Sequence, residues 1–409
     1  MKYWLSLVLL SLTLIPFVYG LRLGSSTWDM LAISTQYQTS QYCLTGYRMQ
    51  HATDALSPSY AKFCGDGTVF TGNLGDPELY TLAGWKYVQG ADPASINFET
   101  QPLTKYLFGL SQFLFHTPLV VQWLGGLTLL ALMYFIARPL LPAPWVFLPA
   151  LVMSWDGLFR EALTLSYVDL VETVFVTGFL LSLPSAVSKK RGYWLPMIFL
   201  GLVALSKSFS VGLVLAAVSL VWLTFLGREI ILGYLRVLWV ALVTYLVGYA
   251  GFFAHHPDPR DFLELHLNIL RLYKSYVPEY PKFEIFRIIF AGRWREWYGT
   301  RGLIPAPGWS LAWPVSLALT AIAAATKTFR THMAVSLHFT WVIFYLVFIS
   351  LRLVFPRYLL PILPSLYLLA SVALVNLFGF ATVKLWQIFP WISRSGRVKQ
   401  SVKSAVRFQ

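Results

Sequence analysis

Six apolar runs of near-spanning length constrain the fold of this 409-residue chain more than any other feature. An α-helix rises ~1.5 Å per residue, so about 20 apolar residues cross a hydrocarbon core ~30 Å thick. The runs lie at 3–20, 119–137, 162–184, 230–253, 333–355 and 358–380. Because 57% of the residues are hydrophobic and only 12% are charged, the bilayer is the expected solvent. We therefore expect an all-α polytopic membrane protein.

Charge and length place four further spans. The run 194–226 would reach ~50 Å as one helix, so we divide it at Ser206-Lys207-Ser208. The segment 143–155 is short, but counting it keeps the basic residues 189–191 on the side opposite the large polar loop. A helix at 310–326 completes about ten spans with both chain ends inside, in agreement with the positive-inside rule.

The polar segments predict how the chain is organised. A large first extracytoplasmic loop at 21–118 and a second at 254–309 belong to a transmembrane catalytic domain at 1–383, and a basic cytoplasmic tail occupies 384–409. Both cysteines, Cys43 and Cys64, lie in the first loop, where an oxidising compartment would join them in a disulfide. Two free thiols are the alternative. An enzyme that acts on a lipid-attached substrate needs such a water-facing surface at the membrane edge.

The net charge of +14 could indicate nucleic-acid binding, but the basic residues fall mainly on the predicted inner side. That placement fits membrane topology and anionic lipid headgroups, so we expect membrane lipids and no nucleic acid as partners. The chain has no Gly-rich phosphate loop, nucleophile elbow or HExxH motif, which argues against a nucleotide-driven pump and the common hydrolases. His255-His256 with Asp258 and Asp261 matches no metal-ligand spacing.

Asp76 is the first candidate for a catalytic residue. Asp76-Pro77-Glu78 is typical of a helix start, with Asp as N-cap and Pro in the first turn, and Gly90 indicates the helix end. A carboxylate just above the membrane could also act as a general base toward an acceptor hydroxyl or amine. A cap and a base are compatible roles.

A second group lies where the first loop re-enters the membrane. Glu99 and Lys105 flank Pro102, and 103–115 has the pattern of an interfacial amphipathic helix. Lysines at this depth commonly extend their charge to the interface. The functional alternative is that Lys105 neutralises a lipid phosphate.

Charges within or beside the apolar runs form a third group. Asp169 and Glu172 share a helix face, and either a functional site or a structural ion pair with Arg160 or Lys207 would explain them. Lys207 lies at the proposed outer turn, where it would bind an anion. In the second outer loop Arg293 stands among tryptophans, a pattern that suits phosphate binding or unspecific headgroup contact.

Three stretches together resemble the GT-C glycosyltransferase superfamily, in particular its protein O-mannosyltransferase and aminoarabinose-transferase branch. They are Asp76-Pro-Glu-Leu-Tyr80, Gly90-Ala-Asp-Pro93 and Phe98-Glu-Thr-Gln-Pro-Leu-Thr-Lys-Tyr106. The resemblance implies a GT-C fold and an inverting hexosyl or pentosyl transfer from a polyprenyl-phosphate-linked donor. The acceptor would be a protein, lipid or glycan on the extracytoplasmic face.

The resemblance also implies roles for individual residues. Asp76 and Asp169 match the family's catalytic acids. The matches for substrate-binding residues are Tyr80, Glu99, Lys105 and, in the closing stretch Arg357-Tyr-Leu-Leu-Pro361, Arg357. To these we add the cations Lys207 and Arg293. Pro77 stands where the family has a second acid, and Thr100-Gln101 replaces the usual residues before the proline. Family members differ in metal use, so a divalent cation stays open, and no nucleotide cofactor is expected.

Two other functions are compatible with the hydropathy pattern. A transporter or flippase of a lipid-linked saccharide would need alternating access and usually inverted repeats. A scaffold or polymerase-like partner without catalytic activity is a third possibility. The long first loop with its acidic helix start favours the enzyme.

Overall fold

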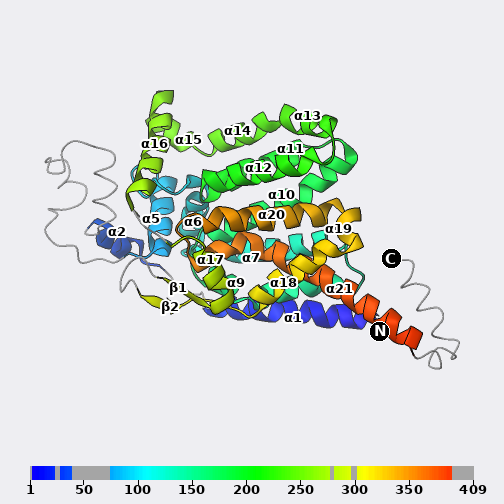
Figure 1. Cartoon of the computed structure of the whole chain (residues 1–409). Coiled ribbons are helices and arrows are strands. Elements are labelled where there is room, and N and C mark those ends of the chain that lie inside the picture. The colour runs from blue at the N-terminus through cyan, green and yellow to red at the C-terminus, as the bar shows by residue number, and fades with distance from the viewer. Residues whose placement is uncertain (1, 24–27, 39–73, 277–280, 296–301, 389–409) are drawn as a thin grey trace, which may run out of the picture.

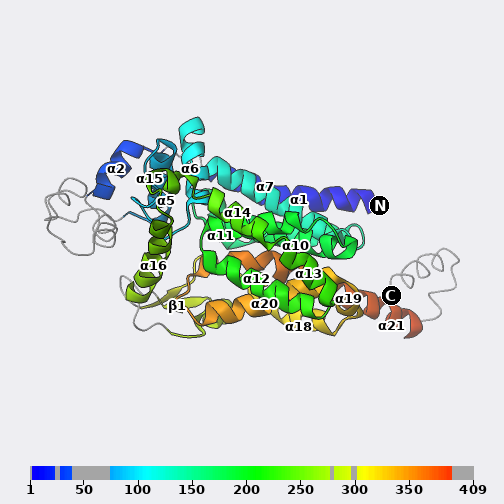
Figure 2. The same ribbon diagram turned by 90° about the horizontal axis from the view of Figure 1, so that it is seen from above.

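The computed structural model describes residues 2–23, 28–38, 74–276, 281–295 and 302–388. Long helices run side by side along one axis, and short helices gather across one end (Figure 1). That end holds the predicted first and second outer loops, whereas the start of the first helix and the end of the last lie at the opposite end in both views (Figures 1 and 2). The orientation relative to the two compartments stays a prediction.

Within the described residues, six segments are long and apolar enough to cross a membrane. They are α1 (Lys2–Leu23), α7 (Leu119–Ala137), α10 (Asp169–Lys189), α13 (Arg228–Arg236) with α14 (Leu238–Val247), α20 (Met333–Ser350), and η2 (Pro356–Ile362) with α21 (Leu363–Ile388). Four shorter apolar elements are η1 (Trp145–Phe147) with α8 (Leu148–Trp155), α11 (Trp194–Ser206), α12 (Phe209–Thr224) and α18 (Ala312–Ala325). These elements overlap the ten expected segments, with different boundaries at two of them. The all-α membrane architecture is confirmed, and the number of crossings stays a prediction.

The predicted division of 194–226 is confirmed by a break between α11 and α12. Lys207 and Ser208 leave helical geometry, and the freed backbone carbonyls of Ser206 and Lys207 accept hydrogen bonds from the Thr104 hydroxyl at 2.8 Å and the Gln101 amide at 3.4 Å. Non-helical backbone at membrane depth is tolerated only where such partners exist. The first loop therefore stabilises the break.

The predicted start of a span at residue 162 was wrong, because α9 (Gly157–Thr164) ends before α10 begins at Asp169. Asp156 caps α9 by accepting from the amides of Leu158 and Phe159. Gln122 then donates to the carbonyls of Leu165 and Tyr167, at 2.7 Å each. These contacts supply hydrogen-bond partners to backbone groups that the interruption of the helix leaves unpaired. Hydropathy did not reveal this interruption.

The predicted span 230–253 is also interrupted. It consists of α13, α14 and α15 (Ala250–His255), with breaks after Arg236 and Val247. Beyond it, the second loop contains α16 (Pro259–Tyr276), α17 (Glu284–Ala291) and a small antiparallel sheet. In the sheet, β1 (Arg293–Arg295) pairs with β2 (Leu303–Pro305), with Trp294 opposite Ile304. The short α19 (Lys327–Thr331) precedes α20.

The two helices expected in the first loop are present as α5 (Asp76–Val88) and α6 (Pro102–Phe115), beside a shorter α2 (Met30–Gln38). Their backbones meet at Gly84 and Gly109. A Cβ atom on Gly84 would lie 1.7 Å from the Lys105 carbonyl oxygen, so only glycine permits this approach. The helix pair forms a compact platform over one end of the bundle.

The structure corrects the role of Asp76 as a helix cap. Gly75 occupies the N-cap position, no side chain caps the helix, and Asp76 is its first residue. Cys43 and Cys64 lie outside the described residues, so their disulfide stays a prediction. The last helix reaches Ile388, and the rest of the predicted tail also lies outside. The domain boundaries stay predictions too.

The α6 helix shows the polarity expected of a helix that contacts lipid. Its buried face carries Thr104, Lys105 and Gln112, whereas Phe113 and Leu114 are exposed. Polar groups are costly in hydrocarbon, so the helix turns them toward the protein. The amphipathic helix predicted from the sequence is therefore present, with its polar side inward.

Candidate active site

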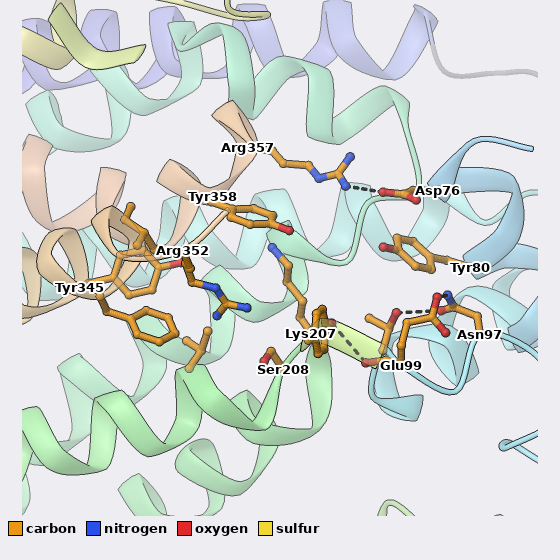
Figure 3. Close-up of a pocket in the computed structure, with 15 residues that line it drawn as sticks. Asp76, Tyr80, Asn97, Glu99, Lys207, Ser208, Tyr345, Arg352, Arg357 and Tyr358 are labelled. Atoms are coloured by element: carbon orange, nitrogen blue, oxygen red, sulfur yellow. Dashed lines mark hydrogen bonds and ion pairs between the residues drawn. The ribbon is translucent and has the colours of Figure 1, made fainter. Parts of the chain in front are cut away.

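A cavity of about 100 Å³ lies where the first loop meets the ends of the membrane helices (Figure 3). It is lined by side chains from both parts of the chain: Asp76, Tyr80, Asn97, Glu99, Thr100, Lys207, Ser208, Val211, Tyr273, Tyr345, Phe348, Ile349, Arg352, Arg357 and Tyr358. The first loop supplies the acids, and the membrane helices supply the cations. The cavity therefore has an acidic wall and a cationic wall.

Interruptions of the helices position the cationic wall. Lys207 extends from the break between α11 and α12, and Arg352 follows the end of α20. Arg357 and Tyr358 come from η2, the 3₁₀ segment that opens the last membrane helix. These elements are far apart in sequence, and their polar side chains converge on one point (Figure 3).

Three ion pairs among the described residues hold the cations, and one of them connects the two walls. The Arg357 guanidinium binds the Asp76 carboxylate, and its Nε lies 3.6 Å from Oδ2 of Asp169. Lys207 binds the other oxygen of Asp169. The Asp169 side chain is 1% exposed and that of Asp76 is 29% exposed. Asp169 thus fixes both cations from behind, while Asp76 faces the cavity.

Aromatic rings hold the same cations from the side. The Lys207 ammonium lies 3.7 Å from the Tyr358 ring centroid, and the Arg357 guanidinium lies 4.4 Å from that of Tyr167. Such cation–π contacts contribute ~0.5–2 kcal/mol and restrict the orientation of the cation. The cationic wall is therefore ordered before any ligand arrives.

Arg352 is bound differently from the other two cations. Its guanidinium donates to the Ser210 hydroxyl at 3.3 Å and lies 4.9 Å from the Phe348 ring centroid. Among the described residues, no carboxylate oxygen lies within 4 Å of it. Of the three cations that line the cavity, Lys207 and Arg357 pair with acids, so Arg352 is the one in the lining without a carboxylate partner among the described residues.

The acidic wall is built on a tight turn at residues 97–100. Asn97 has a left-handed backbone (φ 52°), and its amide donates to Glu99 Oε1 at 2.5 Å while its Oδ1 accepts from the Thr100 hydroxyl at 2.8 Å. Burial raises the pKa of Glu99, which its own backbone hydrogen bond and Lys105 partly offset. Burial, followed by the Asp76 charge, raises the pKa of the Tyr80 phenol, so Tyr80 stays a hydrogen-bond donor.

Five of the eight predicted site residues line the cavity: Asp76, Tyr80, Glu99, Lys207 and Arg357. Asp169 lies directly behind it. Lys105 does not line the cavity and instead binds the carbonyls of Asn97 and Thr100. Arg293 is on the exposed side of β1 and does not line the cavity either.

Sequence reasoning missed Arg352 and Tyr358 in the cationic wall. Arg352 had a detectable signal, because it is a charge inside the apolar run 333–355. Tyr358 had none, since an aromatic residue at a membrane edge is common.

No group of three or more His, Cys, Asp and Glu side chains within the described ranges could hold a metal ion. His256, in the pattern weighed as a metal site, instead contacts Asp92 at 2.9 Å and Asp261 at 3.7 Å.

Two further buried acids do not line the cavity. Asp156 accepts four hydrogen bonds, from the Leu158 and Phe159 amides, the Trp313 indole and the Tyr367 hydroxyl. It joins α9, α18 and α21 in the core. Glu172 is fully buried, and neither of its oxygens has a hydrogen-bond partner within the described part of the chain.

No family model matches the chain, and no curated protein does. Among solved structures it is similar to ArnT from Cupriavidus metallidurans bound to undecaprenyl phosphate, with 16% identity, a TM-score of 0.57, and coverage of 97% of this chain and 64% of ArnT. The apo form of ArnT gives 18% identity, a TM-score of 0.58, and coverage of 80% and 60%. The chain thus spans under two thirds of the ArnT chains it matches.

The archaeal oligosaccharyltransferase AglB from Archaeoglobus fulgidus, in complex with an inhibitory peptide and a dolichol-phosphate, is more distant. Its TM-score is 0.47 at 14% identity, with coverage of 88% of this chain and 51% of AglB. The two ArnT matches are the ones that bear on the fold. The chain has the fold of ArnT, which is the GT-C membrane fold that the motifs of its first loop predicted.

Proposed function

We propose that this protein is an inverting glycosyltransferase that moves a hexosyl or pentosyl group from a polyprenyl-phosphate-linked donor to an acceptor on the extracytoplasmic face. The observation that carries the proposal is a cavity in which the carboxylates of Asp76 and Glu99 share the lining with three cations, and Asp76 binds one of them, Arg357. Transfer from a lipid phosphate requires one base and several cations.

The reaction is a single displacement at the anomeric carbon. The acceptor hydroxyl or amine forms a bond to that carbon while the bond from the carbon to the phosphate oxygen breaks. The electron pair of the breaking bond goes to the polyprenyl phosphate, and the acceptor proton goes to Asp76. Attack opposite the leaving group inverts the configuration, and positioning supplies much of the rate.

The cations stabilise the charge that develops on the leaving phosphate. The donor phosphodiester carries one negative charge, and its release as a phosphate monoester adds a second. Arg352 has no carboxylate within 4 Å among the described residues, so it is the first cation available to the phosphate. Arg357 and Lys207 are adjacent, and Asp169 holds both in place.

Arg357 connects phosphate binding to the base. In the structure its guanidinium binds the Asp76 carboxylate. A phosphate in the cationic wall competes for the same guanidinium. Binding of the donor would thereby release Asp76 to act as the base.

The likeness to ArnT supports a lipid phosphate as the ligand, since one of the ArnT structures holds undecaprenyl phosphate. Six described segments are long and apolar enough to cross a membrane, which is where such a donor resides. The acidic wall, made by Asp76, Glu99 and the turn at 97–100, would then face the acceptor.

Transfer in bilayer discs tests the proposal, using radiolabelled polyprenyl phosphate sugars and a lysate as the source of acceptors. Wild type should form labelled product, and Asp76→Asn should lose at least about 100-fold in rate, since a general base contributes 10²–10⁴-fold. Glu78→Gln is the matched control, because Glu78 lies in the same helical turn and does not line the cavity.

Two results would overturn the proposal. Unchanged turnover in folded Asp76→Asn would remove the base from the mechanism. Movement of the labelled donor across liposomes without any product would identify a flippase.

A further inference from the structure

Lys105 is a buried lysine whose hydrogen bonds converge on one turn. The residue is 1% exposed, and its ammonium donates to the Asn97 carbonyl at 2.6 Å and the Thr100 carbonyl at 2.5 Å. The Tyr87 hydroxyl lies 3.3 Å away. Within the described residues no carboxylate oxygen approaches it to 4 Å. All three N–H groups of the ammonium are thus assigned to neutral oxygens.

The turn that Lys105 binds forms the acidic wall of the cavity. Asn97, Glu99 and Thr100 all line the cavity, opposite the cations. The turn has no sheet to hold it, and Asn97 adopts an uncommon left-handed conformation. Two of its four carbonyls accept from the same ammonium. Lys105 therefore sets the shape of this wall.

The packing of α5 against α6 encloses Lys105. The backbone of Lys105 lies against Gly84 so closely that a Cβ atom there would overlap its carbonyl oxygen. Its ammonium lies 5.3 Å from the Tyr87 ring centroid. The side chain is enclosed between the helices and the turn.

We propose that Lys105 is a positioning residue, whose ammonium holds Asn97, Glu99 and Thr100 as the acceptor-side wall and does not bind the donor phosphate. The catalytic consequence rests on the proposed function, whereas the effect on the turn does not. This role replaces the phosphate contact expected from the sequence.

The proton on Lys105 gives the role a pH dependence. Burial lowers the pKa of Lys105 to about 7, and the Glu99 carboxylate partly offsets that effect. Glu99 and the Tyr87 phenol are the titratable groups that face it. The wall accepts two of the three N–H groups, so a neutral amine can still reach both carbonyls, but without the positive charge these two hydrogen bonds weaken as pH rises through 7.

Stability changes in the opposite direction. The folded-state pKa lies below the unfolded value of 10.5, so between the two the unfolded state binds more protons and this group makes stability rise with pH. If Lys105 were only structural, order in the turn and activity would follow the stability of the protein. Above pH 7 we instead expect turn order and activity to fall while the contribution of this group to stability rises.

Hydrogen exchange on the full chain in bilayer discs tests the effect on the turn. After correction for the intrinsic pH dependence of exchange, protection of peptides covering 91–101 should fall about threefold to tenfold between pH 6 and pH 8.5, because hydrogen bonds from a charged donor are stronger than those from a neutral one. Lys105→Met should have lost that protection already at pH 6. Lys86→Met is the matched control, because Lys86 lies on α5 over the Trp85 ring. Protection that does not change with pH in wild type would overturn the proposal, even if Lys105→Met fails to fold.

Binding of undecaprenyl phosphate distinguishes a wall from a phosphate contact. Lys105→Met should bind it within about twofold of wild type, since a charged hydrogen bond would be worth tenfold or more. A larger loss of affinity would assign Lys105 to the phosphate and refute the positioning role. In turnover, Lys105→Met should lower kcat about tenfold or more through misplacement of the wall, with the donor KM unchanged. If wild type shows no transfer at all, the proposed function fails while the exchange result still decides the role of Lys105.

Discussion

The ion pair between Lys207 and Asp169 can be broken from either side, and burial predicts unequal costs. Lys207→Met leaves an Asp169 carboxylate that is 1% exposed, with Arg357 Nε 3.6 Å away as the remaining cation. Removing one partner of a buried pair costs ~3–5 kcal/mol. Because Arg357 partly compensates, we expect the lower end, about 3 kcal/mol. Asp169→Asn leaves Lys207 14% exposed beside the Tyr358 ring and Arg357 still paired with Asp76, so we expect about 1–2 kcal/mol.

The double variant Lys207→Met/Asp169→Asn removes both charges. Replacing a buried pair with neutral groups is often close to neutral, so its cost should be about 0–1 kcal/mol and far below the sum of the single costs. Undecaprenyl phosphate binding should nevertheless stay weak, because one cation of the wall is gone. Recovered stability without recovered binding would separate the structural role of the pair from its functional role.

Reversible unfolding of the purified protein in mixed micelles, titrated with SDS, gives the free energies. Lys190→Met is the control, since Lys190 is exposed at the C-cap of α10. The expected order of cost is Lys207→Met first, Asp169→Asn second and the double variant last. Additive costs, or a larger cost for Asp169→Asn than for Lys207→Met, would refute the assignment of Asp169 as the buried anchor.

Two further variants separate binding from stability. Arg352→Gln should weaken undecaprenyl phosphate binding about tenfold or more, the value of one charged hydrogen bond, and leave the melting temperature near that of wild type. Equal affinity would remove Arg352 from the phosphate site. Asp156→Asn should do the reverse, because an amide has one acceptor oxygen where the carboxylate accepts four hydrogen bonds. The free energy of unfolding should drop by about 2–4 kcal/mol with lipid binding by the folded protein unchanged, and a loss of binding at full stability would contradict this role.

The membrane architecture was predictable because hydropathy and charge act along the chain. The run at 119–137 coincides with α7, and the division at Ser206-Lys207-Ser208 follows from a length that one span cannot accommodate. The breaks around Leu165 and Val237 were not predicted. They lie in apolar sequence, and at Leu165 the break is stabilised by a distant side chain, Gln122, whose contacts no local pattern shows.

The candidate site was predictable by residue type and only partly by role. Asp76 had the local pattern of a cap, but it pairs with Arg357, 281 residues away in sequence. Lys105 is a residue type that commonly binds phosphate. Its burial between α5 and α6, however, depends on two glycines that permit close packing of these helices. A sequence shows which groups can bind an anion. The fold decides whether such a group is instead hydrogen-bonded to the backbone of a neighbouring turn, as Lys105 is.

The interruptions of the membrane helices are the strongest link between fold and site. Lys207 comes from the break between α11 and α12, Asp169 begins α10 just after the break at Leu165, and Arg357 comes from the 3₁₀ segment before α21. Each interruption frees backbone polar groups that must be satisfied away from lipid, so it occurs where protein or water is near. The same place is where a charged side chain can reach a polar cavity. Three breaks in the membrane segments thus supply the site, and the break predicted at Lys207 from length and charge identified one cavity residue in advance.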